Sequence, residues 1–250
     1  MIEATGVRRS FGDVHAVRDV TLAAHAGRVT GLIGPNGSGK TTLFLMLASL
    51  LAPDAGSIRI GGVDPVVDPQ GARRVAGWMP DALGAWGSLS ARETLAITGR
   101  LFDMAPAVAR GRADELLDIV GLADLADAPA RVLSRGQKQK LGLARAIVHD
   151  PAVLLLDEPA SGLDPEARVN LRVLLRRFAD EGRAVLISSH ILSELDEIAD
   201  DAVFLLGGAT VSPDRVAAAT TRGRVWRVVL AGAEGPEVTS SVARGLGLDP

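Results

Sequence analysis

The stretch from Gly34 to Thr42 constrains the fold of this chain more than any other part of it. Its sequence, Gly-Pro-Asn-Gly-Ser-Gly-Lys-Thr-Thr, fits the pattern G-x-x-x-x-G-K-[ST] of a phosphate-binding loop. The apolar run 29–33 before it is typical of a buried strand, and the run 43–48 after it contains mostly helix formers. Strand, glycine-rich loop and helix, in that order, predict a site for nucleotide phosphates.

The residues of this loop suit phosphate chemistry in several ways. The glycines let the backbone come close to the phosphates, and N–H groups of the loop and of the helix N-terminus face them. Lys40 adds a positive charge toward the β- and γ-phosphates, and the Thr41 hydroxyl can bind Mg²⁺. Among 27 lysines and arginines, lysine occurs only at 40, 138 and 140, so a compact ammonium is kept at the phosphate position. The nucleotide-binding residues predicted from the loop are Gly34, Pro35, Asn36, Gly37, Ser38, Gly39, Lys40, Thr41 and Thr42.

Composition limits the classes of protein to which the chain can belong. It has 250 residues, 47% of them hydrophobic and 23% charged, which is typical of a globular protein with a sizeable core. The net charge of −3 argues against a nucleic-acid partner, and the absence of cysteine excludes a disulfide framework. No signal peptide is visible at the N-terminus. The longest uncharged apolar stretch, 43–52, is about half of the ~20 residues that span a bilayer, so we expect any spanning part on another chain.

Short apolar runs alternate with helical patterns along most of the chain. This alternation predicts an α/β fold with a P-loop NTPase core, in which helices cover both sides of a mostly parallel sheet. The β-like pieces at the start of the chain predict an N-terminal antiparallel β subdomain. Residues 85–132 have a mainly helical pattern, with Ser90 and Glu93 placed as a capping box, and predict an inserted helical subdomain. We expect one domain over residues 1–220 and a small C-terminal appendage of unknown function over 221–250.

Two acidic residues follow a continuous apolar run. The run 152–156 is typical of a parallel strand buried on both faces, and Asp157 and Glu158 come directly after it. Ligands of such sheets bind beyond the carboxyl ends of the strands, which places both acids where chemistry takes place. A second buried strand, 184–187, leads to His190 in the same way.

Together these residues resemble one family, the ATP-binding cassette ATPases that power ABC transporters. The resemblance covers residues 1–215, most of the chain. Its most diagnostic part is Leu-Ser-Arg-Gly-Gln at 133–137, which is similar to the family signature L-S-G-G-Q. The other matching motifs, in family order with the signature, are the Walker A loop (Gly34–Thr41), the Walker B strand (Val153–Glu158), the D-loop (Ser161–Asp164) and the switch histidine (His190).

The resemblance implies a role for each matched residue. Phe11 stands where the family has an aromatic residue that stacks on adenine, although from the residue alone an ordinary packed phenylalanine is the simpler interpretation. Asp157 is implied to hold Mg²⁺, Glu158 to act as the general base for water, and His190 to contact the γ-phosphate. The signature residues are implied to act in trans, on ATP bound by a second cassette. They are Ser134, Arg135, Gly136 and Gln137, and Asp164 belongs to the D-loop.

Two positions depart from the family pattern. Arg135 replaces a glycine of the signature, while Ser134 and Gly136, the residues expected to face the γ-phosphate, are kept. Asp81, in the segment 77–81 that resembles the Q-loop, replaces glutamine. A carboxylate oxygen suits Mg²⁺, which makes Asp81 a candidate metal ligand, but an unpaired carboxylate would also repel the γ-phosphate.

The resemblance implies an ATPase that uses ATP and Mg²⁺ and forms a sandwich dimer, most simply a homodimer, around two ATP molecules. Because the chain has one cassette and no spanning segment, we expect it to serve separate transmembrane permease subunits from the cytoplasmic face of the membrane. Likeness to exporter-type cassettes in residues 79–81 and 134–140 implies export of a small molecule such as a drug or lipid. We expect no nucleic-acid partner.

Two other functions are open at this point. A soluble ABC ATPase acting on ribosomes or DNA usually carries two cassettes, long coiled-coil insertions or metal clusters, and the sequence contains none of these features. A non-hydrolysing regulatory cassette would not need Lys40, Glu158 and His190, all of which are present.

Overall fold

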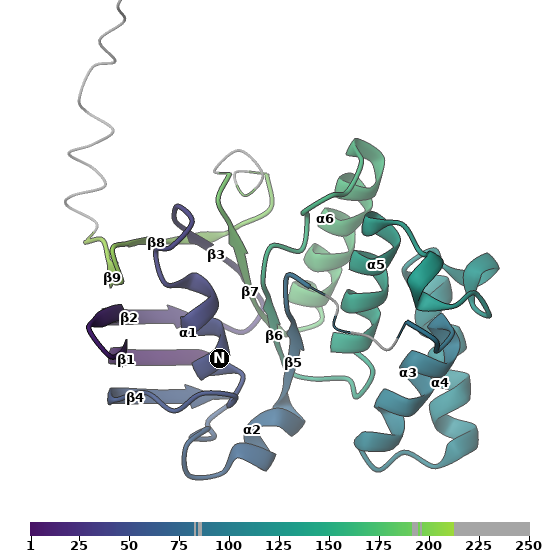
Figure 1. Cartoon of the computed structure of the whole chain (residues 1–250), viewed down its shortest axis with the longest axis horizontal. Helices are drawn as coiled ribbons and strands as arrows, with labels where there is room; N and C mark the ends of the chain where they lie inside the picture. Colours follow the sequence, from purple (N-terminus) through teal and green to yellow (C-terminus); the bar gives the residue numbers. More distant parts are fainter. Residues whose placement is uncertain (83, 85–86, 192–194, 196, 213–250) are drawn as a thin grey trace, which may run out of the picture. The chain divides into compact units, whose positions relative to one another are not determined.

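The phosphate loop follows a strand in the interior of one large sheet. The structure is a computed structural model that describes residues 1–82, 84, 87–191, 195 and 197–212. The strands in these residues are β1 (Ile2–Phe11), β2 (Val14–Ala24), β3 (Val29–Ile33), β4 (Ala55–Ile60), β5 (Ala76–Met79), β6 (Val153–Leu156), β7 (Ala184–Ser189), β8 (Asp201–Leu206) and β9 (Ala209–Thr210). They form a nine-stranded sheet in the order β4-β1-β2-β9-β8-β3-β7-β6-β5 (Figure 1). The loop after β3 therefore emerges between two parallel neighbours, β8 and β7.

The sheet has a parallel part and an antiparallel part. Strands β8, β3, β7, β6 and β5 pair in parallel with one another, as the alternation of strands and helices predicts. In the other part of the sheet, β1 pairs antiparallel with both β2 and β4. The predicted fold class, a mostly parallel core with N-terminal antiparallel strands, is confirmed.

The helices of the described residues are α1 (Lys40–Leu47), α2 (Pro69–Val75), α3 (Ala91–Leu101), α4 (Pro106–Ile119), α5 (Arg135–Ala146) and α6 (Pro165–Asp180), with short 3-10 helices η1 (Ala123–Leu125) and η2 (Ala130–Val132). Helices α3 and α4 pack against each other within the stretch predicted to be helical, and both contact α5. Figure 1 shows this pair on the β5 side of the sheet, away from β1 and β2. The predicted boundary near residue 220 stays a prediction, because residues 213–250 lie outside the described residues.

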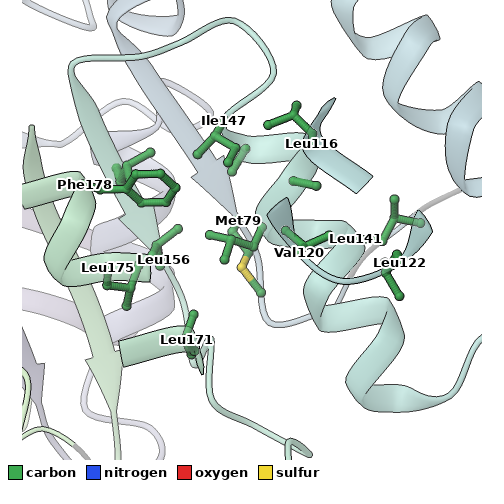
Figure 2. Packing of buried hydrophobic residues seen from close by; sticks show 14 of the residues in the cluster. Met79, Leu116, Val120, Leu122, Leu141, Ile147, Leu156, Leu171, Leu175 and Phe178 are labelled. Carbon is green, nitrogen blue, oxygen red and sulfur yellow. The ribbon is translucent and has the colours of Figure 1, made fainter. Parts of the chain in front are cut away.

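Buried side chains on both faces of the parallel strands hold the helices in place. Val153 and Leu155 of β6 belong to a cluster with α1, whereas Leu154 and Leu156 belong to a cluster with α5 and α6. A strand buried on both faces needs apolar residues at every position, which is why its sequence is a continuous apolar run. Figure 2 shows the second cluster, where Met79 of β5 lies among side chains from α5, α6 and the end of α4. The sheet and the helical pair therefore share one core.

Helix α2 was not predicted from the sequence, although its start carries a recognisable signal. Asp68 caps it by accepting a hydrogen bond of 2.8 Å from Gly71 N, and Pro69 occupies its first position. The helix has only seven residues and a single buried side chain, Ala72. Such a short helix shows no clear apolar periodicity, so the capping residues alone mark it.

Ser90 begins α3 as the sequence predicts. Its Oγ accepts a hydrogen bond of 3.1 Å from Glu93 N, and the Glu93 carboxylate accepts one of 2.8 Å from Ser90 N. These two bonds satisfy N–H groups at the start of the helix that would otherwise lack a partner. The bond from Ser90 N also lowers the pKa of Glu93, because it stabilises the charged carboxylate.

We expect the substitution Ser90→Ala to lower the free energy of unfolding by about 1 kcal/mol, since it removes the N-cap of α3. Ser88→Ala, at an exposed position just before the cap, is the matched control and should change it by less than about 0.5 kcal/mol. Urea denaturation followed by circular dichroism measures both values. Equal losses in the two variants would contradict the capping role.

Candidate functional site

The predicted catalytic residues follow the carboxyl ends of adjacent parallel strands. Ile33 at the end of β3 is paired with Ser189 of β7, and Leu156 at the end of β6 is paired with Ile187 of β7. The strands thus end at nearly the same level. Because the carboxyl ends of parallel strands share one edge, residues far apart in the sequence come together just beyond it.

The phosphate loop has the backbone conformation that its glycines permit. Gly37 and Gly39 have φ values of 78° and 99°, in the left-handed region that favours glycine. A Cβ on Gly39 would lie 2.4 Å from the carbonyl oxygen of Ala16, so a larger residue does not fit there. Lys40, the first residue of α1, is buried, and its Nζ donates a hydrogen bond of 2.7 Å to the carbonyl of Gly34. The lysine ammonium is therefore enclosed by the loop.

Asp157 lies beside the phosphate loop with both carboxylate oxygens bonded. Thr41 Oγ1 donates to its Oδ2 at 2.9 Å, and Ser188 Oγ donates to its Oδ1 at 2.6 Å. Thr41 and Asp157 place two oxygen ligands side by side, which fits Mg²⁺. Among the described residues, no group of three or more histidine, cysteine, aspartate or glutamate side chains could hold a metal ion. Ser188 was not predicted as a site residue.

The Glu158 carboxylate lies between two groups from other segments. Its Oε2 is 2.9 Å from His190 Nδ1, and its Oε1 is 3.7 Å from Lys40 Nζ. The Glu158 side chain is 14% exposed and that of His190 is 46% exposed, which places this pair at the rim of the site. Glu158 has a φ of 50°, a left-handed conformation that costs a residue other than glycine about 1–2 kcal/mol. Strained backbone of this kind gathers at functional sites.

The signature residues form the first turn of α5. Ser134 Oγ accepts a hydrogen bond of 3.2 Å from Gln137 N, and Gln137 Oε1 accepts one of 2.8 Å from Ser134 N. Ser134 and Arg135 are exposed. No hydrogen bond joins the signature to the phosphate loop within the described part of the chain. The structure therefore does not bring these two predicted parts of the site together in one chain.

The signature instead contacts the D-loop of the same chain. The Arg135 guanidinium donates a hydrogen bond of 2.6 Å to Ser161 Oγ. A Cβ on Gly136 would lie 3.3 Å from the carbonyl oxygen of Gly162, so glycine allows this close approach. Asp164, at the end of the D-loop, caps α6 by accepting a hydrogen bond of 2.8 Å from Ala167 N. The signature and the D-loop are thus held next to each other within the chain.

Phe11 ends β1 and is 48% exposed, which is unusual for a large aromatic ring. The Arg9 guanidinium lies over the ring, 4.9 Å from its centroid. That guanidinium is held by the Asp54 carboxylate at 2.7 Å and by the carbonyl of Ala52 at 3.2 Å. One face of the ring is therefore covered by a fixed cation, and an adenine base would have to stack on the other face.

Asp81 follows β5 at the same edge of the sheet, but its side chain is exposed. Its backbone carbonyl accepts a hydrogen bond of 3.1 Å from the buried Gln139 Nε2 of α5. Its carboxylate makes no hydrogen bond or ion pair with other described residues. The role of Asp81 as a metal ligand stays a prediction.

More than half of the chain matches one protein-family model. That model, described as ABC transporter, matches residues 17–161. The chain belongs to the ABC transporter family. It is 34% identical over 216 residues to the ABC transporter ATP-binding protein NatA of Bacillus subtilis, covering 84% of this chain and 88% of that protein. It is 39% identical over 199 residues to the Nod factor export ATP-binding protein I of Burkholderia lata, covering 80% of this chain and 66% of that protein.

A solved ABC cassette has the same fold. The dimeric structure of MJ0796, described as a bacterial ABC transporter cassette, matches with a TM-score of 0.78 and 25% identity, covering 85% of this chain and 97% of that one. The predicted family, fold class and enzyme class, an ATPase, are therefore confirmed. The chain spans about two thirds of the length of the Burkholderia relative. The roles of individual residues stay predictions.

We expect Lys40→Ala to weaken ATP binding by roughly 10- to 100-fold, because hydrogen bonds to charged groups contribute about 1.5–3 kcal/mol. Titration calorimetry with ATP and Mg²⁺ measures the affinity. Lys140→Ala, which removes a lysine from the middle of α5, is the control and should bind ATP as the parent does. An unchanged affinity in Lys40→Ala would contradict the assignment of the phosphate loop.

We expect Asp81→Gln to leave ATP turnover unchanged or to raise it, since the exposed carboxylate is not engaged with Thr41 or Asp157 and glutamine restores the family residue. Steady-state ATPase assays measure kcat. Asp103→Asn, at an exposed acid that pairs with Arg74, controls for loss of charge. A severe loss of kcat in Asp81→Gln alone would show that the carboxylate itself takes part in the reaction.

Proposed function

We propose that this chain is the ATP-hydrolysing subunit of an ABC exporter, and that two copies close on ATP to drive membrane subunits carried by separate chains. The division of the site carries this proposal. Lys40, Asp157 and Glu158 lie together, whereas the signature at the start of α5 opens to solvent. Each chain would therefore offer one half of a site to its own ATP and the other half to a partner.

The assembled half fits phosphoryl transfer to water, which needs neutralised charge, an oriented water and an in-line approach. Lys40 and the loop N–H groups would bind the β- and γ-phosphates, while Thr41 and Asp157 would hold Mg²⁺, which adds further positive charge. Glu158 would orient the attacking water and accept its proton. His190, bonded to Glu158, would steady that carboxylate and contact the γ-phosphate.

The other half fits an anion supplied by a second chain. The N-terminus of a helix presents free N–H groups and a partial positive charge, both of which favour phosphate. Ser134 and Gly136 lie in that first turn of α5. The dimeric state of the MJ0796 cassette supports a sandwich in which the signature of one chain completes the site of the other.

An apolar groove is the proposed docking site for the membrane subunits. It has a volume of about 370 Å³ and is lined by Trp78 of β5, Leu101 of α3 and Arg145 of α5, among others. Leu101 is 78% exposed. His149 forms part of the wall, stacked on Phe102 with ring centroids 3.7 Å apart, and burial lowers its pKa, which favours the neutral ring. A groove of this kind suits a short apolar helix of a permease.

In this proposal the membrane subunits, rather than this chain, span the membrane. Within the described residues, no helix is long and apolar enough to cross a bilayer. We propose that the chain acts at the cytoplasmic face of the membrane, bound to permease subunits, on the strength of relatives that are named as ATP-binding proteins of transporters. The Nod factor export protein among its relatives supports export of a small molecule, and the family model covers residues 17–161.

We expect Glu158→Gln to accumulate as a dimer in the presence of ATP and Mg²⁺, because ATP binds but water is no longer activated. Size-exclusion chromatography with light scattering measures the mass, and the same run with ADP should give the monomer. The variant Glu158→Gln with Ser134→Asp is the matched control. Aspartate is as good an N-cap as serine, so α5 keeps its cap, but its charge would repel the phosphates of the partner's ATP.

A Glu158→Gln variant that stays monomeric with ATP while still binding it would contradict the sandwich. Dimers that also form in the Ser134→Asp double variant would show that the signature does not face the nucleotide.

A further inference from the structure

Ser188 contacts both acids of the site through one hydroxyl group. It lies near the end of β7, which pairs with β6, and is 1% exposed. Its Oγ donates a hydrogen bond of 2.6 Å to Asp157 Oδ1 and accepts one of 2.9 Å from the backbone N of Glu158. The donor and one acceptor position of the hydroxyl are thus both used by the two residues that follow β6.

We propose that Ser188 is a positioning residue for ATP hydrolysis, which holds the metal-binding carboxylate of Asp157 and the backbone of Glu158 in one fixed arrangement. The inference rests on the proposed function, since it assigns Asp157 to Mg²⁺ and Glu158 to water. It adds a residue that acts through these two rather than on the nucleotide itself.

Asp157 is the first of the two acids that Ser188 holds. Its two oxygens receive one hydroxyl each, from Thr41 and Ser188, so the carboxylate plane is fixed at both ends. Each carboxylate oxygen has a second acceptor position. Those positions remain for Mg²⁺ or for its bound water. Groups that orient a metal-binding side chain in this way typically change metal affinity or activity by about 10- to 100-fold when removed.

Glu158 is the second acid, and Ser188 contacts its backbone. Its φ of 50° is unfavourable for a glutamate, so the surrounding contacts must hold it. The bond from its N–H to Ser188 is a contact at the peptide where this turn begins. It fixes the direction in which the side chain leaves the backbone. From that point the carboxylate reaches His190 and Lys40.

Packing alone does not account for a serine at this position. Residues 184–187, which precede it in β7, are all apolar and buried. A buried hydroxyl in the next strand, Thr30 Oγ1 of β3, has no hydrogen-bond partner among the described residues. The hydroxyl of Ser188 differs because both of its bonds go to the acids of the site.

We expect Ser188→Ala to lower kcat roughly 10- to 100-fold, while the affinity for ATP without Mg²⁺ stays that of the parent, because the phosphate loop that binds ATP is untouched. A second measurement does not depend on turnover. The affinity for a fluorescent ATP analogue is determined with Mg²⁺ and again with EDTA, and the gain caused by Mg²⁺ should fall in Ser188→Ala. Ser188→Cys, which keeps a weaker donor, should lie between the alanine variant and the parent.

Thr30→Val is the matched control, since it removes a buried hydroxyl from the same sheet that bonds to neither acid. It should keep the parent's kcat and Mg²⁺ effect. A Ser188→Ala variant with the parent's kcat and Mg²⁺ effect would overturn the inference, as would equal losses in Thr30→Val. If Ser188→Ala does not fold, Ser188→Cys takes its place. A folded Ser188→Cys variant with the parent's kcat and Mg²⁺ effect would then overturn the inference.

A loss of kcat with an unchanged Mg²⁺ effect would also overturn the assignment to the metal-binding carboxylate. These outcomes are separate from failure of the proposed function. A parent chain that binds ATP but does not hydrolyse it would contradict the proposed ATPase site, whatever Ser188 does.

Discussion

The hydrogen-bonded carboxylate of Asp157 is the interaction on which the rest of the site depends. It is 1% exposed, and a buried carboxylate is costly unless it is hydrogen-bonded. Thr41 and Ser188 supply those bonds from segments 116 and 31 residues away in the sequence. Asp157 N in turn donates a hydrogen bond of 2.9 Å to the carbonyl of Met79 at the end of β5. One residue therefore ties the phosphate helix, two neighbouring strands and its own strand to a common point.

These segments meet at Asp157 because the strands of the sheet pair in one register. That register follows from the burial of the strands on both faces of the sheet. A shift of one residue in β6 would exchange Leu154 and Leu156, which pack with α5 and α6, for Val153 and Leu155, which pack with α1. The same shift would turn Asp157 and Glu158, which follow the strand, toward the opposite faces of the sheet. The apolar runs that carry no chemistry thus decide where Asp157 and Glu158 stand, and a substitution deep in either cluster acts on catalysis through this register.

Much of this arrangement could be predicted from the sequence because the signals are local. The strand, glycine-rich loop and helix around Lys40, the apolar run before Asp157 and the capping box at Ser90 each lie within about twenty consecutive residues. What the sequence could not predict depends on pairs brought together by the fold. Ser188 becomes a partner of Asp157 only through the pairing of β6 with β7, and Arg135 meets Ser161 only after α5 packs beside the D-loop. The exposure of the Asp81 carboxylate could not be predicted from the sequence either, since the position of Asp81 indicates the end of a strand but not the direction of the side chain.

Helix α5 connects the parts of the protein that the reaction has to link. Its first turn carries Ser134, its buried Gln139 bonds to the backbone of Asp81 at the edge of the sheet, and Arg145 near its end lines the apolar groove. A second connection runs from α1, where Phe44 stacks on Trp78 with ring centroids 5.5 Å apart, and Trp78 lines the same groove. A helix moves as a rigid element, so in the proposed dimer a partner's phosphate that drew in Ser134 would also displace Gln139 and Arg145. The groove would then be altered from both sides, by the chain's own nucleotide through Phe44 and by the partner's nucleotide through α5. In the proposed dimer, the membrane subunits would thus respond to closure of both chains rather than to ATP binding in one chain.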